Sequence, residues 1–205
     1  MPPQLLLVRH GETEWTISGQ HTGGATDIPL TENGREQAER HGAALAGREF
    51  ARVLSSPLSR ALDTCRLAGL GDVVETTEDL VEWNYGEYDG LTTPAIREKA
   101  PGWSLWTDGA PGGETAADVG ARVDRILEEV RSLHSAQGAA RAQEGDVVLF
   151  AHGHVLRVLT ARWLGLPPTE GRLFALYPAS VSVLGFERET PVIIRWNAPA
   201  GEPIT

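Results

Sequence analysis

Cationic and imidazole side chains follow two apolar runs of this sequence. Arg9 and His10 come directly after residues 5–8, and His152 comes directly after residues 146–151. A neutral imidazole held in one tautomer is a nucleophile for phosphoryl groups. Arginine binds phosphate oxygens with its planar fork and does not lose its proton. These residue types therefore favour chemistry on a phosphate ester.

Transfer of a phosphoryl group through histidine needs further parts. Cations must stabilise the charge on the equatorial oxygens, and a carboxyl group must protonate the leaving alkoxide and later deprotonate water. The chain supplies candidates for every part. They are Arg9, His10, Arg60, Glu82 and His152.

Each of these residues also has a purely structural explanation. An Arg-His-Gly sequence after a strand is usually a turn with a packed histidine, and Arg60 alone could be a solvated helix cation. Glu82 alone could be an ordinary loop carboxylate, and Glu12, Glu14 or Glu87 could act in its place. The assignment therefore depends on all of the parts meeting in space.

The elements that must bring them together alternate between strand and helix. Continuous apolar runs predict buried strands, and N-capping or proline residues mark helix starts. Strands are expected at residues 5–8, 52–55 and 146–151, and helices at 32–46, 58–67 and 116–136. This order predicts one α/β domain over residues 1–205, a three-layer α/β/α sandwich with a mostly parallel sheet. Ligands bind such sheets at the carboxyl ends of the strands, so the polar clusters should converge there.

Other elements are expected around this frame. Residues 73–76 predict a further strand, and residues 94–98 predict a short helix that stops before a proline. The stretches 181–186 and 192–196 have the pattern of strands at a sheet edge. Residues 137–145 are polar and predict a surface loop.

The charge and composition exclude several classes of function. The formal net charge is −10, which repels nucleic acid and anionic lipid at long range. No apolar run approaches the length of a membrane span. Cys65 is the one cysteine, so no internal disulfide can form, and it is expected to be a small buried residue. We expect a cytoplasmic protein without nucleic-acid or membrane partners.

No metal or other cofactor is expected. His21, His41 and His134 have no partner at metal-ligand spacing. His152 and His154 are two apart, but no carboxylate or cysteine partner stands out for them. Residues 109–113 are glycine-rich but lack the Gly-Lys-Ser/Thr ending of a nucleotide P-loop. That segment is interpreted as a turn before a helix.

Four segments in order resemble the histidine phosphatase superfamily, which includes phosphoglycerate mutases and many small phosphatases. They are LVRHGETEW at 7–15, SSPLSRA at 55–61, EWNYG at 82–86 and AHGH at 151–154. The resemblance spans nearly the whole chain, and it implies a metal-independent enzyme that carries phosphate on a histidine.

The resemblance implies a role for each candidate. His10 would be the nucleophile, with its other ring nitrogen fixed by a backbone carbonyl. Arg9, Arg60 and His152 would form the phosphate pocket. Glu82 would be the proton donor and acceptor.

It also implies a set of substrate-binding residues. Thr22 and Gly23 would reach toward the substrate, and Thr16 stands where many members have an asparagine that donates to phosphate. His154 would either contact substrate or support the pocket. The full set expected to bind substrate is Thr16, Gln20, Thr22, Gly23, Tyr85, Gly153 and His154.

An aromatic group lies close to Glu82 in the sequence. Its members are Trp83, Tyr85, Trp103 and Trp106. Clusters of this kind are most often part of a hydrophobic core, but these side chains could also form pocket walls.

Three segments are similar to sugar-phosphate phosphatases of the sedoheptulose bisphosphatase type and to mycobacterial acid phosphatases: residues 19–23, 82–91 and 103–114. Mutases typically have His-Gly-Asn where this chain has His-Gly-His at 152–154, and they carry longer inserts. The expected function is therefore hydrolysis of small phosphorylated metabolites, sugar phosphates among them. A bisphosphoglycerate-dependent mutase and a catalytically inactive phosphate-binding domain are the alternatives. The resemblance also allows a homodimer, since dimers are frequent in that family.

Overall fold

A computed structural model describes residues 3–135 and 145–204 of the chain. Within them, one sheet holds strands in the order β3-β2-β4-β1-β5-β6. Their bounds are β1 Leu5–Arg9, β2 Phe50–Ser55, β3 Glu75–Thr76, β4 Asp146–Ala151, β5 Ser180–Glu187 and β6 Thr190–Pro199. The first four strands are mutually parallel, and β5 and β6 are antiparallel to their neighbours. The prediction of a mostly parallel sheet is confirmed.

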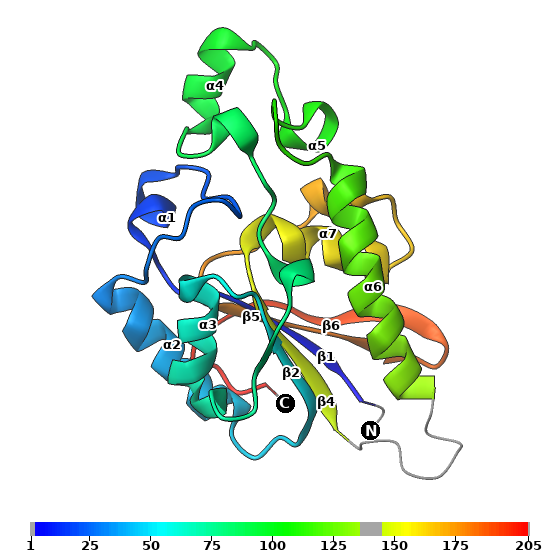
Figure 1. The fold of residues 1–205 in the computed structure, drawn as a ribbon. Coiled ribbons are helices and arrows are strands. Elements are labelled where there is room, and N and C mark those ends of the chain that lie inside the picture. Colours follow the sequence, from blue (N-terminus) through cyan, green and yellow to red (C-terminus); the bar gives the residue numbers. More distant parts are fainter. Residues whose placement is uncertain (1–2, 136–144, 205) are drawn as a thin grey trace.

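Helices cover both faces of this sheet (Figure 1). In β1, Leu5 and Leu7 pack into one apolar cluster, and Leu6 and Val8 pack into another. This division follows from the alternation of side chains along a strand. The first cluster includes α6 (Ala116–Ser135) and α7 (Gly153–Trp163), and the second includes α2 (Glu32–Leu45) and α3 (Ser59–Cys65). The predicted three-layer architecture is confirmed.

The helix expected at residues 58–67 is interrupted. The α-helical part, α3, ends at Cys65, and a π-helical turn follows over Arg66–Leu70. Gly69 in that turn has a φ of 84°, a conformation that glycine adopts without a steric penalty. Cys65 is buried as predicted, and burial raises the pKa of its thiol to about 12.

Short helices lie beyond the carboxyl ends of the strands. They are α1 (Glu14–Ser18), α4 (Thr93–Lys99) and α5 (Leu105–Asp108), and Figure 1 shows α4 and α5 farthest from the sheet. Short 3-10 turns occur at Glu78–Leu80, Gly86–Tyr88 and Pro168–Leu173. Only α4 is predicted from the sequence, because α1 and α5 are too short to display an apolar period.

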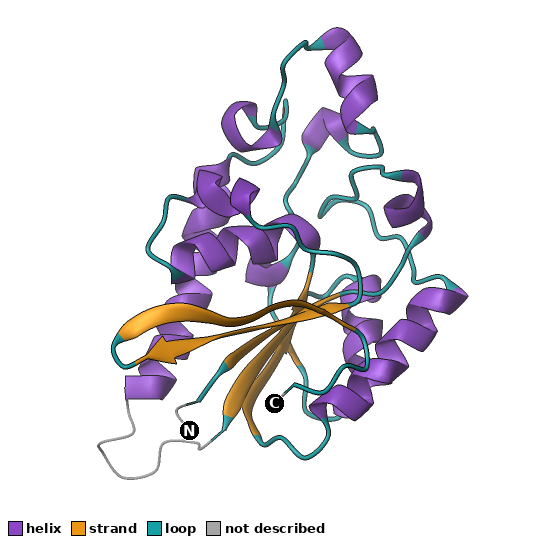
Figure 2. Cartoon of the chain, turned by 180° about the vertical axis from the view of Figure 1, so that it is seen from behind, coloured by secondary structure: helices purple, strands orange, loops and turns teal. Residues whose placement is uncertain are grey.

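The two C-terminal strands form a hairpin, seen from behind in Figure 2. Strand β6 lies at the edge of the sheet as expected. Strand β5 does not, because it lies between β1 and β6 and is almost entirely buried. Its continuous apolar run is the pattern of an inner strand. The loop expected at residues 137–145 falls mostly outside the described residues.

Candidate active site

The segments that follow β1, β2 and β4 meet at the carboxyl ends of these strands. Strands β1 and β2 flank β4 and run parallel to it, with Arg9 opposite Ala151 and Ser55 opposite Phe150. The backbone N–H of His10 donates to Ala151 at 3.0 Å. Segments more than 90 residues apart in sequence therefore lie side by side, and the expected convergence is confirmed.

His10 is held as a neutral imidazole in one tautomer. Its Nδ1 lies 2.7 Å from the carbonyl oxygen of Gly11. A carbonyl only accepts, so Nδ1 carries the proton and Nε2 keeps its lone pair. Burial, together with the nearby Arg60 and Arg9, lowers the pKa of His10 well below 6.5. The imidazole is thus in the state that a nucleophile requires.

Glycine is required next to this imidazole. A Cβ on Gly11 would lie 2.3 Å from the backbone oxygen of Gly34, near the start of α2. That oxygen belongs to the main chain and cannot move aside. The close approach packs the loop after β1 against α2, which fixes the carbonyl that orients His10.

Arg9 presents an unsatisfied donor. Its Nη1 donates to the carbonyl oxygen of Leu176, and its buried Nε has no hydrogen-bond partner among the described residues. Burial lowers the pKa of Arg9 to about 10, which leaves the guanidinium charged at neutral pH. A buried polar group without a partner calls for an explanation, and an oxyanion bound beside His10 would supply one.

Arg60 and His152 form the base of the site. Nε of Arg60 donates to Nδ1 of His152 at 3.1 Å, so Nε2 of His152 carries the ring proton and donates to Ser56 Oγ at 2.8 Å. The rings of His152 and His10 are 5.2 Å apart. Burial lowers the pKa of His152 well below 6.5, with Arg60 adding to the effect.

The remaining donors of Arg60 hold the loop that precedes α2. They donate to the carbonyl oxygens of Thr22, Gly23 and Thr26, and the guanidinium also lies 3.7 Å from Asp27. Arg60 is fully buried. In this arrangement it orders residues 22–27 beside His10.

The carboxylate of Glu82 receives three backbone N–H groups. Oε1 accepts from Trp83 at 2.8 Å and from Val155 at 2.9 Å, and Oε2 accepts from His154 at 2.9 Å. Two of these donors belong to the first turn of α7, where unpaired N–H groups and the helix dipole favour an anion. A carboxylate has about four acceptor sites, so the vacant one lies on Oε2.

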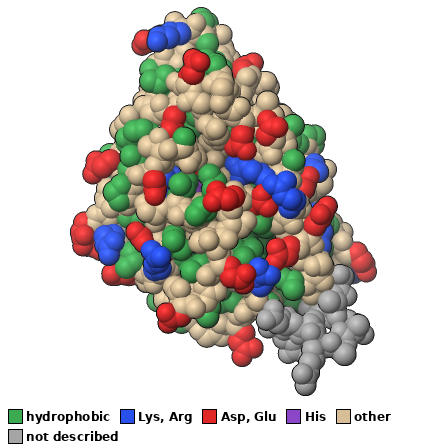
Figure 3. Space-filling view, viewed as in Figure 1, with side chains coloured by type: hydrophobic (Ala, Val, Ile, Leu, Met, Phe, Trp, Pro, Cys, Tyr) green, Lys and Arg blue, Asp and Glu red, His purple; other side chains and the backbone are tan. Residues whose placement is uncertain are grey.

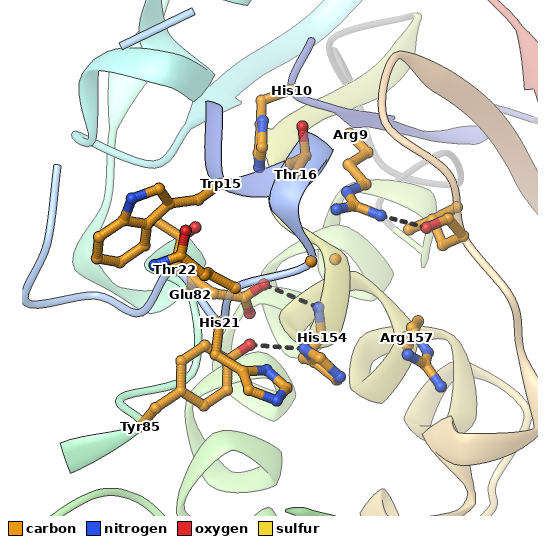
Figure 4. Close-up of a pocket in the computed structure, with 14 residues that line it drawn as sticks. Arg9, His10, Trp15, Thr16, His21, Thr22, Glu82, Tyr85, His154 and Arg157 are labelled. Carbon is orange, nitrogen blue, oxygen red and sulfur yellow. Dashed lines mark hydrogen bonds between the residues drawn. The ribbon is translucent and has the colours of Figure 1, made fainter. Parts of the chain in front are cut away.

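A cavity of about 220 Å³ joins most of these groups (Figure 4). This volume is below the ~300 Å³ at which pockets for drug-sized ligands begin, so it suits a small metabolite. Six of the seven expected substrate-binding residues line it: Thr16, Gln20, Thr22, Tyr85, Gly153 and His154. Gly23 does not, because its N–H donates to Asp89 at 2.7 Å instead. Arg60 and His152 are not among the lining residues either.

Glu82 differs in position from the other carboxylates that could act as the acid and base. Glu82 is the carboxylate among the described residues that line the cavity, and Glu12, Glu14 and Glu87 are absent from the lining. Glu12 accepts from the hydroxyl of Thr31 at 2.8 Å instead.

His154 belongs to the wall of the cavity and is tied to Tyr85. Its Nδ1 lies 2.6 Å from the hydroxyl of Tyr85. Burial lowers the pKa of His154 well below 6.5 and raises the pKa of Tyr85 well above 10. Both groups are neutral at pH 7 and make a polar, uncharged part of the wall.

Some of the aromatic residues near Glu82 form the cavity wall, and others belong to the hydrophobic core. Tyr85 lines the cavity, whereas Trp83 and Trp103 are buried in the core. Trp106 packs edge-on against Trp83, with ring centroids 5.6 Å apart.

The cavity wall contains residues that the sequence analysis did not predict to act on substrate. They are Trp15, Gly19, His21, Arg157 and Leu176. Arg157 lies three positions after His154 on α7, and residues so spaced share a face of a helix. Leu176 gave no signal, since it precedes β5 in a loop.

The described residues contain no group of three histidine, cysteine, aspartate or glutamate side chains that could hold a metal ion. No helix in the described part of the chain is long and apolar enough to cross a membrane. Figure 3 shows acidic side chains scattered over one face with arginines among them. Acidic and basic side chains are therefore mixed on that face, without a broad basic patch.

Residues 5–199 match the histidine phosphatase superfamily, branch 1. An acid phosphatase of Mycobacterium tuberculosis is 46% identical over 186 residues, covering 90% of this chain and 87% of the phosphatase. A sedoheptulose 1,7-bisphosphatase of Saccharomyces cerevisiae is 37% identical over 189 residues, covering 81% and 69%. The solved structure of a Mycobacterium tuberculosis open reading frame superposes with a TM-score of 0.88 at 41% identity, covering 98% of this chain and all of the other.

Proposed function

The chain belongs to the histidine phosphatase superfamily, branch 1, and from that premise we propose that it hydrolyses small phosphorylated metabolites through a phosphohistidine on His10. Its phosphatase relatives include an acid phosphatase and a sugar bisphosphatase. They support phosphomonoesterase activity and favour sugar phosphates as substrates.

In the first step, Nε2 of His10 attacks the phosphorus atom. A phosphorus–nitrogen bond forms as the ester phosphorus–oxygen bond breaks. Glu82 gives a proton from the vacant position on Oε2 to the leaving alkoxide, which departs as an alcohol. Arg9, whose side chain lines the cavity, stabilises the negative charge on the equatorial oxygens.

In the second step, Glu82 takes a proton from water on the same oxygen. The hydroxide attacks the phosphohistidine, the phosphorus–nitrogen bond breaks, and inorganic phosphate leaves. Glu82 is again protonated and His10 is again neutral, so the cycle closes. Arg60 supports both steps because it orders the loop at residues 22–27. His152 supports them because its ring packs against that of His10, with centroids 5.2 Å apart.

The observation that carries this proposal is the 2.7 Å contact between Nδ1 of His10 and the carbonyl of Gly11. It leaves Nε2 unprotonated in the cavity that Arg9 also lines. Substrate labelled with radioactive phosphorus should give an acid-labile, base-stable label on the protein. The label should be absent from His10→Ala, and a label that persists in that variant would overturn the assignment.

Phosphate release from the same labelled substrate separates the alternatives. A phosphatase releases phosphate continuously, in amounts far above the amount of protein. A bisphosphoglycerate-dependent mutase would instead interconvert phosphoglycerates with little release, and an inactive phosphate-binding domain would release none. His-Gly-His at 152–154, in place of the His-Gly-Asn typical of mutases, favours hydrolysis.

We also infer a cytoplasmic location and no nucleic-acid partner. The single cysteine supports the first and the net charge of −10 supports the second. The frequency of dimers in the family makes a homodimer the oligomeric form to test for. Cell fractionation, a filter-binding assay with DNA and RNA, and sedimentation analysis test them in turn.

A further inference from the structure

Gln37 lies on α2 and faces the loop that follows the nucleophile. Its Oε1 accepts the backbone N–H of Glu12 at 2.9 Å. A backbone N–H only donates, so the atom that faces it is the amide oxygen and not the amide nitrogen. Gln37 is partly buried and is not among the described residues that line the cavity. Any effect of Gln37 on the reaction must therefore pass through the protein.

The N–H of Glu12 and the carbonyl of Gly11 belong to one peptide group. The carbonyl oxygen lies 2.7 Å from Nδ1 of His10, and the N–H donates to Gln37. The two groups of a trans peptide point in opposite directions, so this peptide group lies between the imidazole and the side-chain amide. Hydrogen bonds in such a chain polarise one another. Gln37 thus acts at the far end of the chain that sets the tautomer of His10.

Helix α2 holds both backbone polar groups of Glu12. The N–H donates to Gln37, and the carbonyl accepts the N–H of the N-cap residue Thr31 at 3.0 Å. A Cβ on Gly34 would lie 2.2 Å from the carbonyl oxygen of Glu12, so the helix and the loop touch through their main chains. Gly34 and Gln37 are three residues apart, which places them on one face of the helix. Gly34 allows the close approach, and Gln37 supplies the acceptor.

The peptide group directly after His10 is anchored separately. The carbonyl of His10 accepts the N–H of Ala179 at 2.9 Å, and the N–H of Gly11 donates to Oγ1 of Thr64 at 3.2 Å. These contacts fix the main chain of the nucleophile but not the next peptide group. Among the described residues, Gln37 provides the side chain that accepts from that next peptide group.

We propose that Gln37 is a positioning residue for the nucleophile: it holds the Gly11–Glu12 peptide group, whose carbonyl fixes the tautomer and direction of the His10 imidazole. The hydrogen bond made by one ring nitrogen of a histidine determines the protonation of the other, so a loosened peptide group would free the imidazole to turn. The inference rests on the proposed function, because it takes Nε2 of His10 as the attacking atom. It adds no chemical step.

Gln37→Leu removes the acceptor and keeps a side chain of similar size. The kcat/KM for p-nitrophenyl phosphate should fall about 10-fold to 100-fold, the scale of a misplaced reacting group. Competitive inhibition by inorganic phosphate should stay within about twofold, because the cavity that binds phosphate is unchanged. Asn33→Leu is the matched control, since it replaces an amide by leucine at an exposed position of the same helix. Thermal unfolding of both variants shows whether the fold is kept.

NMR spectroscopy separates positioning from a general loss of structure. With isotopically labelled histidine, spectra at pH 7 show which ring nitrogen of His10 carries the proton, and His10→Ala identifies its signals. The wild type should carry the proton on Nδ1. In Gln37→Leu this proton should exchange faster with water, because the carbonyl that holds it is no longer fixed.

Gln37→Glu is the conservative variant, because a carboxylate keeps an acceptor at this position. A charge-assisted hydrogen bond is stronger than a neutral one, and the effect should pass along the chain of hydrogen bonds to His10. The Nδ1 proton of His10 should therefore resonate further downfield than in the wild type, and kcat/KM should stay within about threefold. This measurement decides the inference in the event that Gln37→Leu does not fold.

Three results would overturn the inference. The first is wild-type kcat/KM in a folded Gln37→Leu, and the second is an equal loss in Gln37→Leu and Gln37→Glu. The third is an unshifted Nδ1 proton of His10 in Gln37→Glu. The spectra need no turnover, so a failure of the proposed function is seen separately. If the wild type releases no phosphate from p-nitrophenyl phosphate, the phosphatase assignment itself is wrong.

Discussion

Oε2 of Glu82 accepts the backbone N–H of His154 at 2.9 Å. This contact joins the proposed acid and base to the first turn of α7, the helix that starts directly after His152. The N–H groups of that turn need an acceptor, so one carboxylate both caps the helix and faces the cavity. The position of Glu82 relative to His10 is thus fixed through β4 and α7, although its own segment lacks regular structure.

Glu82→Gln should slow the hydrolysis of alkyl phosphates by about 100-fold or more, the usual scale for a lost general acid. An alkoxide leaves poorly unless it is protonated as the bond breaks, and the amide has no proton to give. p-Nitrophenyl phosphate has a better leaving group, so its phosphorylation step should suffer less. Phosphate release and the level of phosphohistidine on both esters measure this.

An equal loss on both esters would instead give Glu82 a role in structure or in activating water. No loss on either ester would remove it from the mechanism. The amide also offers one acceptor oxygen where the carboxylate offers two, so unfolding of Glu82→Gln must be measured beside its activity.

The segment that carries Glu82 depends on a second carboxylate. Glu114 accepts from Arg122 Nε at 2.8 Å and from the backbone N–H of Asn84 at 2.8 Å, and its carbonyl accepts from Trp83 Nε1. Arg122 is buried. Glu114→Ala should lower the free energy of unfolding by about 2 to 4 kcal/mol, because it leaves a buried cation unpaired.

Urea unfolding measures this loss. The double variant Glu114→Ala/Arg122→Met should recover part of it, since no unpaired charge remains. Additive losses in the double variant would contradict the pairing as the cause.

The sequence predicted the parts of this site that follow strands or fit a motif. Arg9, His10 and His152 could be placed because the carboxyl ends of parallel strands share one edge of a sheet. The contacts of Arg60 with Thr22, Gly23 and Thr26 could not be predicted, because they depend on the path of an irregular loop.

The sequence also predicted only part of the structure of β5 and did not predict α1. The apolar run of β5 predicted a strand but not its place inside the sheet, because pairing with β1 is a long-range choice. Helix α1 is formed by a local capping box between Thr13 and Thr16, and five residues are too few to show a period. The hydroxyl of Thr16, which was predicted to donate to phosphate, instead donates its one proton to the carbonyl oxygen of Thr13 at 2.8 Å.

Gly153→Ala should weaken binding of inorganic phosphate about tenfold. A Cβ at this position would lie 3.2 Å from the guanidinium carbon of Arg9, and Arg9 is already held by the carbonyl of Leu176. Alanine suits a helix better than glycine, so stability should not fall. Competitive inhibition by phosphate measures the effect, and unchanged inhibition would mean that Arg9 does not bind the phosphoryl group.

Activity should survive prolonged treatment with EDTA followed by dialysis. In the proposed mechanism, arginine provides the charge stabilisation that a metal ion would otherwise provide. The described residues offer no cluster of metal ligands. The rate on p-nitrophenyl phosphate before and after treatment measures this. A loss that zinc or magnesium restores would count against the scheme.

His41 should make the fold sensitive to acid, away from the cavity. It lies on α2, is fully buried, and neither ring nitrogen has a hydrogen-bond partner among the described residues. Burial lowers its pKa to about 4, and the neighbouring Arg40 adds to the effect. Between pH 6.5 and 4 the unfolded chain binds a proton at His41 that the folded chain does not bind. Stability should therefore fall as the pH falls through this window, by about 2 kcal/mol from this residue at pH 5.

His41→Leu tests this, because leucine has no proton to bind. The pKa values of His10, His152 and His154 are lowered as well, so the variant should keep part of the acid sensitivity. Each protein is unfolded in urea at pH 7 and at pH 5. The stability at pH 5 is compared with the stability at pH 7 of the same protein, so the effect of leucine on packing cancels. The loss between the two pH values should be about 2 kcal/mol smaller in His41→Leu, and an equal loss in both proteins would show that His41 is not the acid-sensitive group.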